Sequence, residues 1–382
     1  MRAPLRIAQV LASTGTGGME LAPLLLAQGL QKKGQQVSIW TDPGTFLGKK
    51  TLEGRFQVQP FHYHGYFSPR GIREIREALV KEKPDLIHLH NTRDLPVVVP
   101  ALKISGWRGP LLLTKHVASN IVKKDILHRW LYRRLDYLLT CSDFIRKNVL
   151  ETCPVAADKV ETSYVPVDLQ RFRFSRQARV KLRRSWGWEK NTIVGMVARV
   201  TPGKGHELFL RVAGKLVQKD PRVRFRLTGL HSPGEKWFFL EMLALRKKMG
   251  LEKSVILEDR VDDVPGFFSA LDLVLHTAPA ESFGMAVAEA MACGRPVVVR
   301  RGGGVAEILE ADEGKARGGL VIDGSDPEVW ADRVSGLLRS KALMGKLGRE
   351  TRKMVARFSL DLWVENHLRW YRKLLGRGTP AL

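Results

Sequence analysis

One pattern runs through the whole chain: short runs rich in Val, Ile and Leu alternate with stretches long and amphipathic enough to be helices. Runs that are apolar on both faces and separated by helices are typical of parallel strands in a sheet covered on both sides. The sequence therefore predicts an α/β fold built from doubly wound sheets. The expected strands span residues 5–11, 37–41, 86–90, 111–116 and 137–142 in the first half, and 192–200, 223–229, 254–258, 273–277 and 296–300 in the second.

The series of strands is interrupted once, which predicts two domains. A chain of 382 residues is also long for a single core. The break is expected after residue 168, in a basic and irregular stretch over residues 171–188. We therefore predict a Rossmann-like N-terminal domain over residues 1–168 and a Rossmann-like C-terminal domain over residues 169–360. Ligands of such sheets bind beyond the carboxyl ends of the strands, so residues at strand ends are the candidates for chemistry.

The charge balance is the unusual bulk property of the chain. Its 63 Lys and Arg residues and 39 Asp and Glu residues give a formal net charge of +24. A field of this size favours anionic partners such as phospholipid surfaces, phosphorylated glycolipids or nucleic acid, with general surface solvation as the alternative. Because no recognised nucleic-acid module is visible, we expect an anionic membrane surface as a partner and no nucleic acid.

Neither a membrane span nor a signal peptide is expected. The longest apolar stretch, residues 21–30, is about ten residues long and is interrupted by Pro23 and Gln28, so it is too short to span a bilayer. The N-terminus lacks the apolar region and the small-residue cleavage site of a signal peptide. We expect a cytoplasmic protein.

No metal or other cofactor is expected either. Cys141, Cys153 and Cys293 have neither the pairing of a disulfide framework nor metal-ligand spacing, and are expected to be buried thiols. No His-Glu-x-x-His or Cys-x-x-Cys motif occurs. The acidic cluster at residues 259–263 leads into Pro265 and is expected to be a helix-initiating loop.

The most informative segment follows the strand expected at residues 273–277. Glu281 lies at the exit of this strand, and a helix of small residues is expected to begin at Phe283. The backbone amides of Phe283, Gly284 and Met285 would then open a helix, and such a terminus suits a diphosphate. The alternative is that Glu281 is only a carboxylate at a helix start.

Glu289 lies about two turns into the same expected helix. Its carboxylate can accept hydrogen bonds from vicinal hydroxyls such as those of a ribose. A solvated position is the alternative, but Ala288, Ala290 and Met291 surround it in the sequence, and an unpaired carboxylate among apolar residues is costly.

The segment over residues 281–296 resembles the Glu-seven-residues-Glu signature of family 4 (group 1) retaining glycosyltransferases, because glycine, alanine and proline positions match alongside both glutamates. The resemblance implies the GT-B fold, in which two Rossmann-like domains face an interdomain cleft. It also implies that Glu281 holds the donor sugar and Glu289 the nucleotide ribose. Arg199 at a strand exit and Lys204 five residues later resemble the family's Arg and Lys-Gly pair. They are therefore expected to face the donor diphosphate and stabilise the charge on the leaving nucleotide.

The resemblance is looser in the first half of the chain. The turn over residues 15–18 resembles the family's glycine-rich first loop, which implies that Gly17 and Gly18 bind the donor. A tight turn with no ligand is the alternative. His116, at the end of a strand, resembles the family's histidine near the donor sugar, although a lone histidine is more often structural.

Two further groups remain ambiguous. Residues 302–304 and Glu307 resemble the family's Gly-rich turn and the following glutamate near the nucleotide, but Glu307 could equally be a first-turn carboxylate matching the helix dipole. His88, His90 and Asn91 end a strand, and both a ligand site and plain packing are left open.

Two helices are singled out by their composition and place. Residues 123–134 combine basic residues with Trp130 and Tyr132, which is typical of a membrane-surface helix. The alternative is a helix that packs Leu127, Trp130 and Leu131 inward. The helix expected at residues 361–374 is predicted to pack back on the first domain, as in GT-B proteins.

Together these features predict a retaining, metal-independent glycosyltransferase. It would move a sugar from a nucleotide-sugar donor to a membrane-associated glycan or glycolipid, an anionic acceptor of lipopolysaccharide type, at the cytoplasmic face of the inner membrane. The alternatives are a nucleotide-sugar epimerase on the same fold, or a non-catalytic basic protein binding membrane or nucleic acid. The predicted catalytic residues are Glu281, His116, Arg199 and Lys204, and the predicted donor-binding residues are Gly17, Gly18, Phe283, Gly284, Met285, Glu289 and Glu307.

Overall fold

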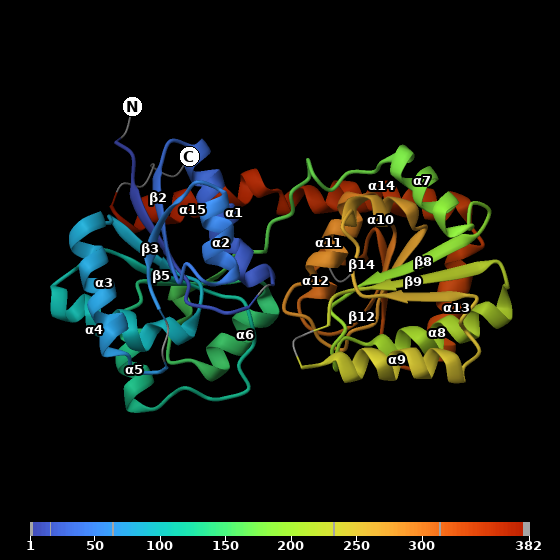
Figure 1. Cartoon of the computed structure of the whole chain (residues 1–382), viewed down its shortest axis with the longest axis horizontal. Helices are drawn as coiled ribbons and strands as arrows, with labels where there is room; N and C mark the ends of the chain where they lie inside the picture. The colour runs from blue at the N-terminus through green and yellow to red at the C-terminus, as the bar shows by residue number, and fades with distance from the viewer. Residues whose placement is uncertain (1–2, 16, 63–64, 232–233, 313–314, 377–382) are drawn as a thin grey trace. The chain divides into compact units, whose positions relative to one another are not determined.

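The computed structural model describes residues 3–15, 17–62, 65–231, 234–312 and 315–376. The chain divides into two compact units (Figure 1). Unit 1 comprises residues 1–166 and 360–382, and unit 2 comprises residues 167–359. Each unit has its own parallel sheet, so the predicted α/β architecture with two doubly wound sheets is confirmed.

Unit 1 is built on a seven-stranded sheet with the order β3-β2-β1-β4-β5-β6-β7. The chain starts in the middle, because β1 pairs in parallel with both β2 and β4, and it winds outward in both directions. The strands are β1 (Arg6–Val10), β2 (Gln36–Thr41), β3 (Gln57–Pro60), β4 (Leu86–Leu89), β5 (Leu111–Lys115), β6 (Tyr137–Thr140) and β7 (Val160–Thr162).

Helices cover both faces of this sheet, as the apolar character of its strands requires. One face packs against buried side chains of α3, α4, α5 and α6, and the other packs against α1, α2 and α15. The helices are α1 (Gly18–Lys32), α2 (Phe46–Glu53), α3 (Pro69–Glu82), α4 (Leu95–Ser105), α5 (Ile126–Arg133), α6 (Asp143–Thr152) and α15 (Leu360–Leu374).

The last helix, α15, belongs to unit 1 although the whole of unit 2 precedes it in the chain. It packs closely on α1: a Cβ added at Gly29 would lie 2.2 Å from Cγ2 of Val364. The Tyr371 hydroxyl reaches the sheet, where it lies 2.7 Å from Nδ1 of His88 and accepts a hydrogen bond from Nε2 of Gln9 at 3.1 Å. These contacts attach the C-terminal helix to β1 and β4.

Unit 2 is built on a six-stranded parallel sheet with the order β10-β9-β8-β11-β12-β15. The direction of winding reverses between β8 and β11, since β8 pairs with both β9 and β11. Such a reversal leaves a crevice at the carboxyl ends of the two strands, which is where open α/β sheets bind ligands. The strands are β8 (Thr192–Val197), β9 (Val223–Thr228), β10 (Val255–Glu258), β11 (Leu273–His276), β12 (Val297–Arg300) and β15 (Gly319–Ile322).

Helices again lie on both faces of the sheet. In Figure 1, α8, α9 and α13 lie on one side of β8 and β9, and α10, α11 and α14 lie on the other. A short hairpin, β13 (Glu310–Asp312) and β14 (Lys315–Ala316), precedes β15. The helices are α7 (Arg176–Trp186), α8 (His206–Lys219), α9 (Lys236–Lys248), α10 (Val264–Ala270), α11 (Met285–Ala292), α12 (Val305–Leu309), α13 (Pro327–Leu338) and α14 (Lys341–Val355).

All ten predicted strands are present, each end within three residues of the prediction. The predicted helix-initiating loop is also confirmed, because the Asp263 carboxylate accepts a hydrogen bond from the amide of Gly266 and caps α10. The sequence did not predict β3, β7 and β15. These strands have three or four residues and lie at sheet edges, so they lack a long apolar run.

The prediction of an irregular stretch over residues 171–188 was wrong, because most of it is helix α7. The helix is capped by Ser175, whose hydroxyl accepts from the amide of Ala178, and it ends at Gly187 with a φ of 67°. Its contact with the rest of unit 2 is largely polar: Arg179 and Arg183 pair with Asp272 at 2.6 and 2.5 Å. A helix that is anchored by arginines shows little apolar periodicity in its sequence, which is why this stretch was expected to be irregular.

Among the described residues, no helix combines the length and the apolar character needed to cross a bilayer.

Candidate active site

The centre of the candidate site is an ion pair between two segments at the reversal point of the unit 2 sheet. Lys204 follows β8 and Glu281 follows β11, and Nζ of Lys204 lies 2.6 Å from Oε1 of Glu281. The two residues are 77 positions apart in the sequence, and the side chain of Glu281 is 18% exposed. The structure therefore brings together two of the residues that the sequence predicted to be catalytic.

Backbone contacts hold Glu281 in place. Its carbonyl oxygen accepts a 2.7 Å hydrogen bond from the amide of Gly304, and an isolated bridge pairs Glu281 with Gly303. Gly303 has a φ of 65°, and a Cβ there would lie 2.1 Å from the Glu281 carbonyl oxygen. The glycine turn over residues 302–304 thus serves to let the backbone approach Glu281 closely, which only glycine permits at this position.

Lys204 is positioned in a similar way. Gly205 has a φ of 79°, and a Cβ there would lie 2.3 Å from the carbonyl oxygen of Thr277. The Thr277 hydroxyl in turn donates to the carbonyl oxygen of Gly205 at 2.7 Å. The loop after β8 is therefore fixed directly against the end of β11, where it carries Lys204 to Glu281.

His276 is a member of this group that the sequence did not single out. Its Nε2 lies 3.7 Å from Oε1 of Glu281, and burial lowers the pKa of His276, with the positive charge of Lys204 acting in the same direction and the Glu281 carboxylate opposing it. A polar residue at the end of the apolar run over residues 273–277 was the available signal. A neutral imidazole here can hydrogen-bond a ligand or Glu281 without adding charge.

The helix that follows Glu281 begins two residues later than predicted. Phe283 does not start it: its side chain is buried and packs edge-on against Phe358, with ring centroids 5.4 Å apart. Gly284 has a φ of 101°, which is left-handed rather than helical, so α11 starts at Met285. The first amides of a helix have no partner within it, and this terminus, next to Glu281, has the donors that an anion requires.

Glu289 lies on α11 and is half-buried. Burial raises its pKa to about 7, with the positive charge of Arg171 opposing the rise. No hydrogen bond or ion pair is found for its carboxylate among the described residues. A carboxylate held this way, on a helix whose neighbouring residues are buried, is suited to accept hydrogen bonds from the hydroxyls of a ligand.

The remaining predicted residues of unit 2 have weaker support. Arg199 lies in the loop after β8 and is exposed, without an ion pair to any described residue. Glu307 lies in the first turn of α12, where its carboxylate complements the helix dipole. The carbonyl of Glu307 accepts from Nη2 of Arg357 at 2.8 Å.

The predicted residues of unit 1 lie at the carboxyl ends of β1 and β5. Gly17 caps α1, and its amide donates to Oε2 of Glu20 at 2.8 Å, while the Ser13 hydroxyl donates to the other oxygen of this carboxylate at 2.7 Å. Gly18 is the first residue of α1, and Thr16 of the same turn lies outside the described residues. The Gly17 amide thus has an internal acceptor, which is what the tight-turn alternative expects.

His116 directly follows β5 and is half-buried. Its ring stacks on that of His90 at 5.8 Å, its Nε2 has no hydrogen-bond partner among the described residues, and burial lowers its pKa to about 4. A neutral ring with an unpaired nitrogen can accept or donate one hydrogen bond to a ligand.

His88 and His90 fit the packing alternative. Both are buried, and His88 contacts the Tyr371 hydroxyl and the Thr114 hydroxyl at 2.7 Å each, while Nε2 of His90 lies 2.6 Å from Oε1 of Gln9. They connect the sheet of unit 1 to α15. All three cysteines are buried and none forms a disulfide bond, as predicted.

The predicted basic helix is shorter than expected. It begins at Ile126, so Lys123 and Lys124 lie in the loop before it. Tyr132 was predicted to face a membrane, and that was wrong: the side chain is buried and its hydroxyl donates to Sγ of Cys153. The exposed apolar residues of this region are instead Ile121, Val122 and Ile126, which are 69%, 63% and 87% exposed, and Trp130, which is 37% exposed.

No group of three or more metal-ligating side chains occurs in the part of the chain that the structure describes.

Two family models match the chain. The model described as glycosyl transferases group 1 matches residues 179–354, and the model described as glycosyltransferase family 4 matches residues 16–171. The first covers Arg199, Lys204, Glu281 and Glu289. The two matches together span nearly all of both units.

Individual known proteins also relate the chain to glycosyltransferases. A D-inositol 3-phosphate glycosyltransferase from Salinispora arenicola is 28% identical over 320 residues, which cover 78% of this chain and 70% of that protein. The structure of a glycosyltransferase from Rickettsia africae superimposes with a TM-score of 0.87 at 20% identity and covers 98% of this chain and 99% of its own. The structure of HepE from Anabaena in complex with UDP and glucose gives a TM-score of 0.80 at 22% identity, with coverage of 95% and 99%. The chain has the GT-B fold and belongs to the group 1 glycosyltransferases, enzymes that transfer glycosyl groups.

Proposed function

We propose that this enzyme transfers a sugar, with retention of its anomeric configuration, from a nucleotide-sugar bound at the carboxyl edge of the unit 2 sheet. The observation that carries the proposal is the arrangement around the start of α11. There the paired Lys204 and Glu281, the free helix terminus and the unpaired Glu289 carboxylate offer partners for a diphosphate, a sugar and a ribose. Each of these groups has the charge or hydrogen-bonding capacity that the corresponding part of a nucleotide-sugar requires.

In the proposed reaction, the bond between the anomeric carbon and the diphosphate oxygen breaks, and the acceptor oxygen forms a new bond to the same face of that carbon. The acceptor proton passes to the leaving diphosphate. Arg199 and Lys204 stabilise the negative charge that grows on this leaving group, and electrostatic stabilisation of this kind acts chiefly in the transition state. Glu281 hydrogen-bonds sugar hydroxyls, a role that the family resemblance also gives to His116. We propose that no metal ion is needed, because the cations of the protein supply the positive charge.

Uridine diphosphate is the nucleotide to test first. HepE, which shares the fold, has been solved with UDP, with UDP-glucose and with UDP and glucose. Gly17, Gly18 and Glu307 are retained in the proposal as residues near the donor, on the basis of their resemblance to the family.

We further propose that the acceptor is an anionic glycolipid, of lipopolysaccharide or related cell-envelope type, reached at the cytoplasmic face of the inner membrane. The support is the surface of unit 1 formed by Ile121, Val122, Lys123, Lys124 and Ile126, here called the α5 patch. Three exposed aliphatic side chains flank two lysines in it, a combination that favours the boundary between lipid headgroups and acyl chains.

A soluble phosphorylated polyol is a second candidate acceptor. The relative from Salinispora arenicola and several other relatives are described as D-inositol 3-phosphate glycosyltransferases. The strongly positive charge of the chain suits either kind of anionic acceptor.

The test is a transfer assay with a panel of nucleotide-sugars, each offered with a lipid extract of envelope membranes, with D-inositol 3-phosphate, or with no acceptor. We expect release of nucleoside diphosphate that depends on the lipid extract, proceeds equally in EDTA, and yields a product with the anomeric configuration of the donor. Conversion of the donor without any acceptor would identify an epimerase instead. Turnover only with D-inositol 3-phosphate would select the soluble acceptor.

A further inference from the structure

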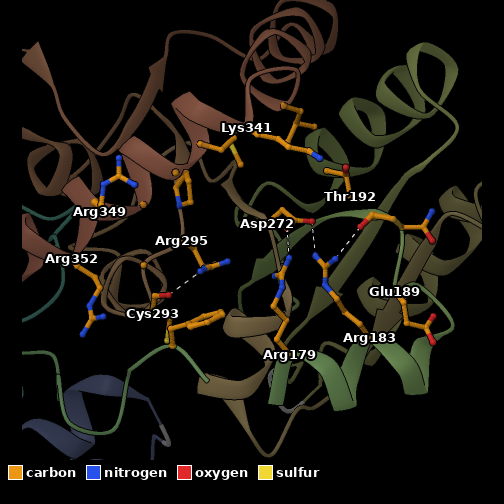
Figure 2. A pocket seen from close by; sticks show the side chains of 18 of the residues that line it. Arg179, Arg183, Glu189, Thr192, Asp272, Cys293, Arg295, Lys341, Arg349 and Arg352 are labelled. Atoms are coloured by element: carbon orange, nitrogen blue, oxygen red, sulfur yellow. Dashed lines mark hydrogen bonds and ion pairs between the residues drawn. The ribbon is translucent and has the colours of Figure 1, made fainter. Parts of the chain in front are cut away.

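Unit 2 contains a pocket at the edge of its sheet opposite to the candidate active site (Figure 2). The pocket has a volume of about 640 Å³. Its wall includes Thr192 at the start of β8, Asp272 directly before β11 and Pro296 directly before β12. Lys204 and Glu281 follow the other ends of β8 and β11. The pocket is therefore separate from the site proposed for the donor.

The lining of this pocket is strongly cationic, with seven Arg and Lys side chains against two carboxylates. Part of this charge is neutralised within the protein, since Arg179 and Arg183 from α7 converge on Asp272 at 2.6 and 2.5 Å, as Figure 2 shows. They also donate to the carbonyl oxygens at the end of α10, so their donors are largely used. These two arginines therefore form part of the wall of the pocket.

The remaining cations have no such partner. They are Lys190, Arg295, Lys341, Arg349 and Arg352, and in the described part of the chain none of them forms an ion pair with a carboxylate. In Figure 2, Arg349 and Arg352 lie on one side of the pocket and Arg179 and Arg183 on another, with Arg295 between them. Unpaired cations that converge from different elements repel one another, so an anion placed among them would be stabilised.

Arg295 is the most constrained of these cations. It is half-buried, and it donates to the carbonyl oxygens of Cys293 and Leu271 while its guanidinium lies 4.8 Å from the ring centroid of Phe174. Burial, followed by repulsion from Arg179, lowers its pKa to about 10. Its Nη2 atom makes no hydrogen bond to any described residue. A guanidinium held rigidly with a free donor is suited to bind a phosphate oxygen.

The opposite wall is one face of α14. Lys341, Gly345, Gly348, Arg349 and Arg352 recur on this face at helical spacing, and the two glycines leave room between the charged side chains. The helix is also fixed close to the turn that follows α11, because a Cβ at Gly348 would lie 2.6 Å from the carbonyl oxygen of Gly294. The cations are thus carried by a helix that is packed against the turn between α11 and β12.

We propose that this pocket is a second ligand site, which binds a small molecule carrying two or more phosphate charges. The volume is in the range of about 300–1,000 Å³ that is usual for small-molecule sites and exceeds what a single inorganic ion would fill. Arginine is the side chain best suited to phosphate, since its planar donors can bind two oxygens at once. Phe174 and Met344 add an apolar surface for the rest of such a molecule.

The test measures the binding of inorganic pyrophosphate by isothermal titration calorimetry at fixed salt, in the Lys204→Ala background to weaken the donor site. We expect the Arg349→Ala/Arg352→Ala double substitution to lower the affinity at least tenfold. The matched control is Lys247→Ala/Lys248→Ala, which removes the same charge from exposed positions of α9 and is expected to change the affinity less than twofold. Circular dichroism checks that all variants are folded.

Two further arms identify the source of the phosphate and separate this proposal from that for the donor. Vesicles containing phosphatidic acid replace pyrophosphate in one arm, in a Lys123→Glu/Lys124→Glu background that weakens vesicle binding through the α5 patch. Sedimentation lost when Arg349→Ala/Arg352→Ala is added indicates a lipid headgroup, and unchanged sedimentation indicates a free phosphorylated molecule. In the other arm, UDP binding with Lys204 intact is expected to stay within twofold in the Arg349→Ala/Arg352→Ala variant.

Three results would overturn the proposal. An equal loss of pyrophosphate binding in both double variants would show only a general effect of surface charge. No pyrophosphate binding in the Lys204→Ala background would leave the donor site as the sole phosphate site. A single-stranded oligonucleotide that binds more tightly than pyrophosphate, through the same arginines, would assign the pocket to nucleic acid.

Discussion

At the scale of single residues, the pair formed by Lys204 and Glu281 determines what the site can do. Each side chain holds the other in place, and the glycines at positions 205 and 303 fix the two backbones. A lysine so positioned can follow the charge of a leaving diphosphate with little rearrangement, and preorganised charge is the usual source of large catalytic effects. Substitution of Lys204 therefore tests leaving-group stabilisation more directly than substitution of an exposed cation.

We expect Lys204→Ala to lower kcat at least tenfold, which corresponds to about 1.4 kcal/mol of lost transition-state stabilisation, and to change the donor KM less. Steady-state kinetics of nucleotide release measures both constants. Lys215→Ala is the control, because it removes a lysine from an exposed ion pair with Glu328 in the same unit. A variant whose KM rises while kcat is unchanged would mean that Lys204 only binds substrate.

Glu289 gives a prediction about pH. Its pKa in the folded protein, about 7, lies above the ordinary value of 4.5, so the protonated form favours folding. This contribution is complete below about pH 4.5 and is lost as the pH rises through about 7. Allowing for solvent screening of a half-buried group, we expect Glu289→Gln to stabilise the protein by about 1 kcal/mol at pH 8 relative to wild type.

The measurement is urea unfolding of wild type and Glu289→Gln at pH 8 and at pH 5. The difference in the free energy of unfolding should shrink at pH 5, where wild-type Glu289 is itself mostly protonated. A difference that is the same at both pH values would show that the effect of the amide is unrelated to ionisation of Glu289.

At the scale of elements, α7 depends on polar anchoring. Burial alone would raise the pKa of Asp272, but Arg179 and Arg183 outweigh it and hold this pKa below its ordinary value. Removing one partner of a largely buried ion pair leaves uncompensated charge. We expect Asp272→Ala to lower the free energy of unfolding by about 3 kcal/mol, measured by chemical denaturation.

A matched control is Glu53→Ala, which breaks the exposed pair of Lys50 and Glu53 and should cost about 0.5 kcal/mol or less. Equal effects of the two substitutions would mean that the arginine pair does not anchor α7.

The elements also show what the sequence could and could not predict. The central strands were predictable because burial on both faces requires uninterrupted Val, Ile and Leu. Helix α7 was not predictable, since its docking depends on Arg179 and Arg183 reaching Asp272, which lies 93 and 89 residues away in the sequence. The start of α11 was placed two residues early because Gly284 was given a helical conformation, whereas its φ is 101°. Glycine permits both the helical and the left-handed conformation, and the sequence does not show which of the two Gly284 adopts.

The candidate active site also contains residues that the sequence predicted and residues that it could not predict. The Glu281 motif and the strand exits predicted that Lys204 and Glu281 belong to one site, and the strand order places them together. His276 was missed because a histidine inside an apolar run is usually a packed residue. The second pocket could not be predicted, since its cations come from α14 and from the turn after α11, and no motif connects these segments.

At the scale of the whole molecule, the net charge of +24 includes two groups of cations that suit different anions. The pocket of unit 2 is lined by arginines from several elements, whereas the α5 patch of unit 1 combines two lysines with exposed aliphatic side chains. Lysines near an anionic surface contribute roughly 1 kcal/mol each, and the attraction falls off within a Debye length of about 8 Å at physiological salt.

We expect the protein to sediment with vesicles containing anionic lipid, to bind neutral vesicles weakly, and to release as salt rises. Lys123→Glu/Lys124→Glu should reduce the binding at least tenfold, and Ile121→Ser/Ile126→Ser should reduce it with little change in salt dependence. Lys247→Glu/Lys248→Glu on α9 is the control of equal charge. Binding that falls equally in the two lysine variants would show that the α5 patch contributes no more to vesicle binding than another basic surface does.

The central claim, that Glu281 holds the donor sugar and Glu289 the nucleotide ribose, is tested most directly by comparing the dissociation constants of UDP and UDP-glucose in two variants by calorimetry. We predict that Glu281→Gln weakens UDP-glucose at least tenfold while UDP stays within about twofold, and that Glu289→Gln weakens both ligands to a similar extent, with tenfold equal to about 1.4 kcal/mol. Unchanged affinity for both ligands in both variants, with wild type binding them, would contradict the account and place the nucleotide elsewhere on the enzyme.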